Sequence, residues 1–129
     1  MKVIKAFRYH PDEKPHFLFH GNNGSTVVPL NKWVRAERRI VRDGSGKTFY
    51  ASGFHAFTQK SALKEWQKST KHKHVVATAH VRVTWEKSHS RHKGVVLAKW
   101  LYVSSAAWKN ALKRWKDEMV QDQSQHLDQ

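Results

Sequence analysis

Hydrophobic and polar residues alternate most regularly over residues 75–86, VVATAHVRVTWE. Every odd position there is apolar, and all but one of the even positions are polar. A period of two with one apolar side is typical of a half-buried antiparallel strand. Residues 95–105 (VVLAKWLYVSS) follow a polar loop at 87–94. We therefore predict that they form the second strand of a hairpin.

Two segments have the spacing of amphipathic helices. Residues 59–69 place Ala62, Leu63 and Trp66 on one face, and Thr58 or Ser61 is expected to cap this helix. A longer helix is predicted to begin after a cap at Ser104 or Ser105. Its apolar stripe, which is expected to pack on the sheet, consists of Trp108, Leu112, Trp115 and Met119.

Shorter strands are predicted over residues 2–9, 16–20 and 47–57, and Gly53 is expected to kink or bulge the last of them. Turns rich in Gly and Asn or Ser separate them at 21–25 and 43–46. Residues 27–43 have mixed features. A helix could begin at Asn31, but the alternation from Arg38 to Arg42 favours a strand.

These elements predict one α+β domain over residues 1–120: a mostly antiparallel sheet of four to six strands with two helices packed on one face. A small, strongly curved β-barrel with a C-terminal helix is the alternative. Residues 121–129 are rich in Gln and Asp and are expected to form a polar, acidic tail that frays.

The charge balance points to an anionic partner. The 129 residues include 24 Lys and Arg against 10 Asp and Glu, for a formal net charge of +14. Four of the acidic residues lie in the last 13 positions, so residues 1–116 hold all 24 basic groups and only 6 acidic ones. Nucleic acid is the default partner for such a surface. We therefore expect a non-enzymatic module that binds DNA or RNA through phosphate contacts.

Other classes of protein are disfavoured. Without Cys there is neither a disulfide framework nor a thiolate metal site. No apolar stretch approaches the roughly 20 residues that span a bilayer, and the N-terminal segment lacks the continuous apolar core of a signal peptide. The chain is thus expected to be cytoplasmic, in a bacterium or a phage-infected host cell, with no membrane partner. Its few central carboxylates are not clustered, which argues against a two-metal nuclease.

The expected contacts to nucleic acid are an exposed Trp and three basic segments, at residues 35–42, 68–74 and 87–93. The loop 87–93 combines cations, hydroxyls and imidazoles, all of which suit phosphate oxygens. The arginines of segment 35–42 share one face if it is helical and divide between faces if it is a strand. Trp33 or Trp100 would stack on unpaired bases. The predicted binding residues are Arg35, Arg38, Arg39, Arg42, Lys71, Lys73, Lys87, His89, Arg91, His92, Lys93 and Trp33.

The ten histidines raise a metal hypothesis. His72 and His74, and likewise His89 and His92, have the spacing of chelating pairs. His80 could lie near His72 or His92 in the folded sheet. Lysines and arginines flank most of them and would oppose a dication. We therefore predict no metal and no other cofactor.

The histidines also leave an enzyme open as a further alternative. A metal-independent enzyme acting on RNA or a nucleotide would use His55 with His80 or His20 as its acid–base pair. His55 follows Gly53 in the segment Ser52–Ala56 (SGFHA), which would hold the ring at a defined angle.

Two short segments resemble small uncharacterised phage and prophage proteins. These are Lys5-Ala6-Phe7 in the opening strand and the SGFHA segment, eight residues in all. The resemblance implies a phage-like origin, in which short basic proteins handle nucleic acid or counter host defences. It also implies the alternative function, a phage-type interaction protein that binds an acidic host protein.

Overall fold

The computed structural model describes residues 1–18, 26–36, 40–42, 49–51, 53–70, 73–86 and 94–127. In chain order the elements are β1 (Lys2–Phe7), β2 (Trp33–Arg35), β3 (Ile40–Arg42), β4 (Phe49–Ala51), β5 (Phe54–Phe57), α1 (Lys60–Lys68), β6 (Val75–Glu86), β7 (Val95–Tyr102) and α2 (Ser105–Leu127). The predicted α+β class is therefore confirmed. None of the helices in this described part of the chain is long and apolar enough to cross a membrane.

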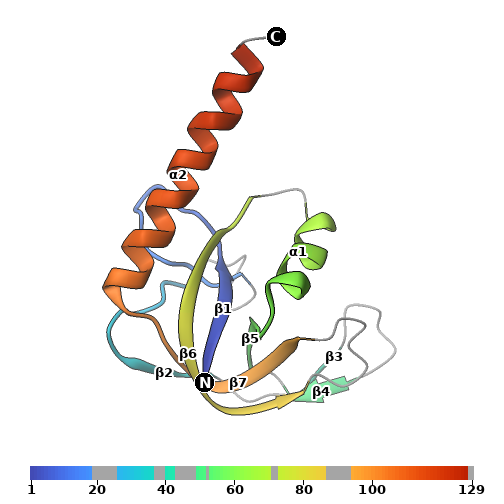
Figure 1. Ribbon diagram of the computed structural model, residues 1–129. Coiled ribbons are helices and arrows are strands. Elements are labelled where there is room, and N and C mark those ends of the chain that lie inside the picture. Colours follow the sequence, from blue (N-terminus) through green and yellow to red (C-terminus); the bar gives the residue numbers. More distant parts are fainter. Residues whose placement is uncertain are drawn as a thin grey trace.

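Five antiparallel strands form the main sheet, in the order β2-β7-β5-β1-β6. Strand β6 also pairs with β7, which closes β1, β5, β7 and β6 into a four-stranded barrel with β2 added at the edge of β7 (Figure 1). The number of strands agrees with the predicted sheet, and the closure gives it the strong curvature of the alternative. Helix α2 packs along β6, and α1 contacts β5.

A bend in β6 makes this closure possible. Its first half, from Val75 to His80, pairs with β1, and Lys2 lies opposite His80. Its second half, from His80 to Glu86, pairs with β7. Within the second half, Val83 has a φ of 55° and interrupts the ladder with β7. A β-branched residue rarely adopts this conformation. The predicted apolar alternation accordingly holds through Val81 but not at Val83, whose exposed fraction is 59%.

Large rings fill the core between the sheet and α2. Phe7 is fully buried and meets Trp108 edge to face, with 5.5 Å between ring centroids. Phe17 stacks on Phe54 at 5.0 Å. The predicted stripe of α2 faces this core, because Trp108 and Leu112 are buried in it. Helix α2 then extends beyond the barrel as far as Leu127, so most of the predicted acidic tail is helical (Figure 1).

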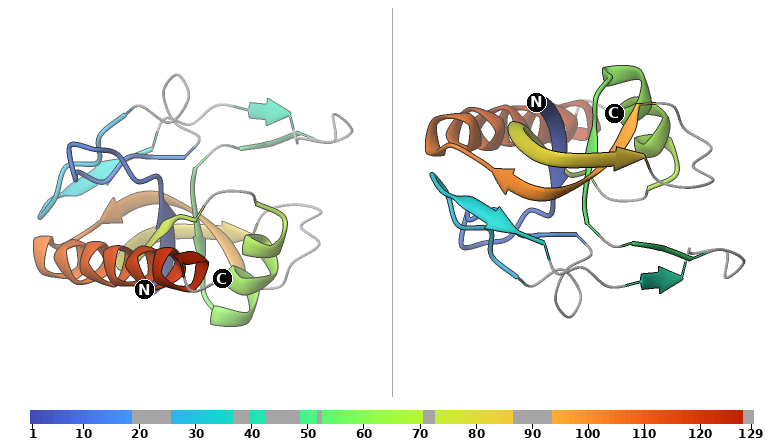
Figure 2. Two further views of the ribbon diagram at one scale, coloured as in Figure 1. Left: turned by 90° about the horizontal axis from the view of Figure 1, so that it is seen from above. Right: turned by 90° about the horizontal axis from the view of Figure 1, so that it is seen from below.

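Three predicted elements differ from the structure. The described part of segment 16–20 forms isolated bridges from His16 instead of a strand. Helix α1 begins after Gln59, without a side-chain cap. The predicted strand 47–57 is divided at Gly53: β4 pairs with β3 in a separate sheet, set apart from the barrel, whereas β5 joins the barrel (Figure 2). The predicted turns at 21–25 and 43–46 lie outside the described residues.

Candidate nucleic-acid interface

Strand pairing brings cationic and aromatic residues together in two adjacent rows on the sheet. Residues directly opposite one another in antiparallel strands lie on the same face. The first row crosses β1, β6, β7 and β2, and the second crosses β6, β7 and β2. We call these residues the cation–aromatic face: Lys2, His80, Tyr102 and Trp33 in the first row, and Arg82, Trp100 and Arg35 in the second.

The residues between the two rows show which way this face points. Val81, Leu101 and Val34 lie opposite one another across β6, β7 and β2. Val81 and Leu101 are buried in the core, and Val34 packs against it. Side chains alternate between the two sides of a strand, so the cation–aromatic face points away from the core. Its cationic and imidazole members are exposed, and its three rings are half-buried.

Cations and rings contact one another within the face. The guanidinium carbon of Arg82 lies 3.8 Å from the centroid of the Trp33 ring, and that of Arg35 lies 5.9 Å from the centroid of Trp100. Trp33 and Tyr102 are tilted by 48° with centroids 5.5 Å apart. A cation–π contact at an exposed site contributes about 0.5–1 kcal/mol. These contacts therefore hold the long arginine side chains close to the rings.

The face has a strongly positive character because neither row contains an acidic residue. Contacts of ion-pair distance between described residues involve other basic residues, namely His10, His16, Lys68, Lys73 and Lys116. The positive charges of Arg35 and Arg82 are thus not neutralised by a carboxylate of the described residues.

Two of the predicted binding residues, Trp33 and Arg35, belong to the cation–aromatic face. Arg42 ends β3 in the separate two-stranded sheet. Both Arg35 and Arg42 are in strands, so the helical alternative for this segment is wrong at both ends. Eight predicted residues lie outside the described part of the chain: Arg38, Arg39, Lys71, Lys87, His89, Arg91, His92 and Lys93.

Lys73 has a different environment from the face. Its Nζ lies 3.1 Å from Oδ2 of Asp122 and 3.4 Å from Oε2 of Glu118, both on α2. The hydrogen bond that Lys73 donates to the Asp122 carboxylate and the charges of both carboxylates raise the pKa of Lys73. This lysine therefore connects the start of β6 to α2, and its charge is largely balanced there.

The strand register separates the two histidines of the enzyme hypothesis. His55 lies opposite Leu97 of β7, and Leu97 lies opposite Trp85 of β6. His80 is five residues before Trp85 and lies opposite Tyr102, which is five residues after Leu97, so five residues of the β6–β7 ladder separate it from the level of His55. The exposed His80 also belongs to the row of Tyr102. The register therefore gives no support to an acid–base pair of His55 and His80.

Sequence reasoning did not identify Lys2, Arg82 and Tyr102 as members of one surface. The available signal was that Arg82 lies on the polar side of the predicted strand 75–86, but its neighbours in space depend on strand order.

One group of three potential metal ligands also lies together among the described residues, and it consists of His10, Asp12 and His16.

No protein-family model, curated protein or solved structure matches this chain.

Proposed function

We propose that the protein is a nucleic-acid-binding module whose cation–aromatic face binds single-stranded DNA or RNA. The observation that supports this is the interleaving of two arginines and three rings across β6, β7 and β2. Aromatic rings stack on unpaired bases and contribute about 1–3 kcal/mol per base. Cations beside them neutralise phosphates, which supplies affinity for any sequence.

The arrangement favours single strands over duplexes for a geometric reason. A duplex presents only base edges in its grooves, whereas a single strand can turn the faces of its bases toward a protein. Trp33, Trp100 and Tyr102 lie on a sheet surface and do not project from a helix or ribbon that could enter a groove. Stacking on such a sheet is the recognition mode of several single-strand-binding folds.

Fluorescence anisotropy with labelled oligonucleotides tests the proposal. Single-stranded DNA and RNA are compared with duplexes of the same sequence, and we expect tighter binding to a single strand. Trp33→Leu keeps an apolar side chain but removes the stacking ring, so we expect about 5- to 150-fold weaker binding.

Trp66→Leu is the matched control. Trp66 is also half-buried, but it lies on α1, where it packs against Phe57 and the ring of His74. We expect this variant to bind like the wild type. Equal losses in the two variants, or a preference for duplex, would contradict the proposed face. If no nucleic acid binds, the proposal is wrong, and the acidic-protein alternative becomes the one to test.

A further inference from the structure

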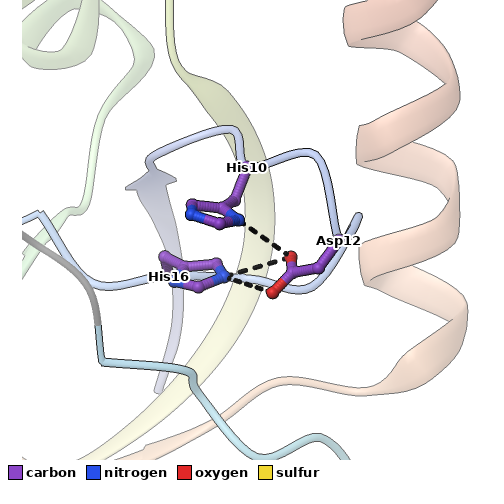
Figure 3. Close-up of side chains that lie close together, drawn as sticks. All are labelled: His10, Asp12 and His16. Carbon is purple, nitrogen blue, oxygen red and sulfur yellow. Dashed lines mark hydrogen bonds and ion pairs between the residues drawn. The ribbon is translucent and has the colours of Figure 1, made fainter.

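Three side chains that suit a transition metal converge in the turn after β1. Nε2 of His16 lies 2.9 Å from Oδ2 and 3.1 Å from Oδ1 of Asp12, and Nδ1 of His10 lies 3.6 Å from Oδ1 (Figure 3). The two imidazole rings stack with centroids 4.2 Å apart. One potential ligand atom from each residue lies within 4.8 Å of the other two.

The surrounding backbone holds this turn in place. The backbone N–H of Arg8 donates to the carbonyl oxygen of His16 at 3.1 Å, and the N–H of Lys14 donates to Oδ1 of Asp12 at 2.8 Å. From α2, the indole N–H of Trp108 donates to the carbonyl oxygen of Glu13 at 2.9 Å. The side chains of the cluster therefore start from a backbone that is fixed at several points.

We propose that His10, Asp12 and His16 form a binding site for a divalent transition-metal ion of the zinc type. The ligands would be Nδ1 of His10, a carboxylate oxygen of Asp12 and Nε2 of His16. Two imidazoles and one carboxylate are a common donor set for such ions. At metal–ligand distances of about 2.0–2.1 Å, tetrahedral ligand atoms are about 3.4 Å apart. The observed separations from Asp12 of 2.9 to 3.6 Å are close to this value.

The same residues disfavour other ions and leave one side of the site open. Ca²⁺ and Mg²⁺ prefer six or more oxygen ligands, so two imidazoles do not suit them. The His16 side chain is only 4% exposed, whereas that of His10 is 49% exposed, so the site opens to solvent on the His10 side. Water would complete the coordination there. Lys116, which reaches this region from α2, is paired with Glu13.

Titration of the full chain with Zn²⁺, measured by isothermal titration calorimetry, tests whether these three residues bind a metal ion or only hydrogen-bond to one another. We expect one Zn²⁺ per chain. His10→Ala removes an exposed ligand, and Asp12→Asn removes the charge but keeps the shape. Each should lower the zinc affinity at least tenfold, because a residue that binds the metal contributes at least as much as a residue that only hydrogen-bonds to a ligand. His80→Ala, a change to an exposed histidine elsewhere in the chain, should bind zinc like the wild type.

Thermal melting with and without Zn²⁺ supplies an independent measurement. An ion that binds only the folded state raises the melting temperature. We expect that rise in the wild type and in His80→Ala, and a smaller rise in the other two variants. The proposed zinc site is ruled out if the wild type does not bind zinc stoichiometrically. It is also ruled out if His10→Ala and Asp12→Asn retain wild-type zinc affinity while melting without metal shows that both are folded.

Discussion

The side-chain amine of Lys5 donates a hydrogen bond to the backbone carbonyl oxygen of His55, with 2.6 Å between nitrogen and oxygen. Lys5 is only 6% exposed, and its Nζ lies within 5.9 Å of the ring centroids of Phe7 and Phe17. Burial lowers the pKa of Lys5 from 10.5 to about 7. The folded protein therefore releases this proton near neutral pH, whereas the unfolded chain keeps it until about pH 10.5.

This difference predicts how stability depends on pH. Between about pH 7 and 10.5 the unfolded state binds more protons at Lys5 than the folded state, so the free energy of unfolding rises with pH. The slope from this group is at most about 1.4 kcal/mol per pH unit. Urea denaturation at pH 6, 7, 8 and 9 should show an increase above pH 7 in the wild type and a smaller increase in Lys5→Met.

Lys5→Met is also expected to be more stable than the wild type at pH 6. The shifted pKa corresponds to a cost of roughly 5 kcal/mol for the buried charge, whereas loss of the hydrogen bond to His55 costs about 1–3 kcal/mol. Lys2→Met is the control, because Lys2 lies on the same strand but is exposed. The interpretation of Lys5 is contradicted if all three proteins show the same pH dependence.

The salt dependence of binding is a second prediction, and it tests which cations contact phosphate. For single strands, the logarithm of the affinity falls with the logarithm of salt by about 0.7 per phosphate neutralised. Arg82→Ala and Arg35→Ala should therefore each weaken binding and reduce this slope by about 0.7. Titrations from about 50 to 200 mM salt measure it.

Lys73→Ala is the informative comparison for these arginines. Sequence reasoning placed Lys73 in the interface, but in the structure its ammonium group is paired with Asp122 and Glu118. We expect this change to leave the salt slope unaltered and to lower the free energy of unfolding by less than about 1 kcal/mol, as for exposed ion pairs. A slope that falls as much in Lys73→Ala as in Arg82→Ala would move the interface toward α2.

The elements that could be predicted from sequence are those with one side against the core. Strand β6 is recognisable in the sequence because its apolar residues alternate as far as Val81. Helix α2 is recognisable because Trp108 and Leu112 recur at helical spacing. The closure of the barrel was harder to foresee. It depends on the pairing of β6 with both β1 and β7, and within β6 Val83 has a left-handed backbone that local propensity disfavours for a β-branched residue.

The candidate sites differ in how visible they are in the sequence. Arg82 and Trp33 are far apart along the chain and meet because β7 lies between β6 and β2. No local pattern specifies that strand order. In contrast, His10, Asp12 and His16 lie within one short segment. Their spacing, first two and then four residues apart, was a usable signal, but only the fold shows that the turn brings His16 back toward Asp12.

Gly53 provides the last prediction, at the point where the chain passes from β4 to β5. A Cβ atom built on Gly53 would lie 2.9 Å from the carbonyl oxygen of Ala98 and 2.9 Å from carbon atoms of the Trp85 ring. Backbone on one side and a large ring on the other leave little room to adjust. Gly53→Ala should therefore lower the free energy of unfolding by about 1–3 kcal/mol, as overpacking does.

A double-mutant cycle with Trp85→Leu separates the two contacts. The smaller side chain removes the contact with the ring but not the one with the Ala98 carbonyl oxygen. In that background Gly53→Ala should cost less than it does in the wild type, yet still more than zero, because the carbonyl group belongs to the β5–β7 ladder and cannot move freely. Urea denaturation of the four proteins gives the coupling energy. If Gly53→Ala has the same urea midpoint as the wild type, the space beside Gly53 accommodates a Cβ atom, and the prediction is contradicted.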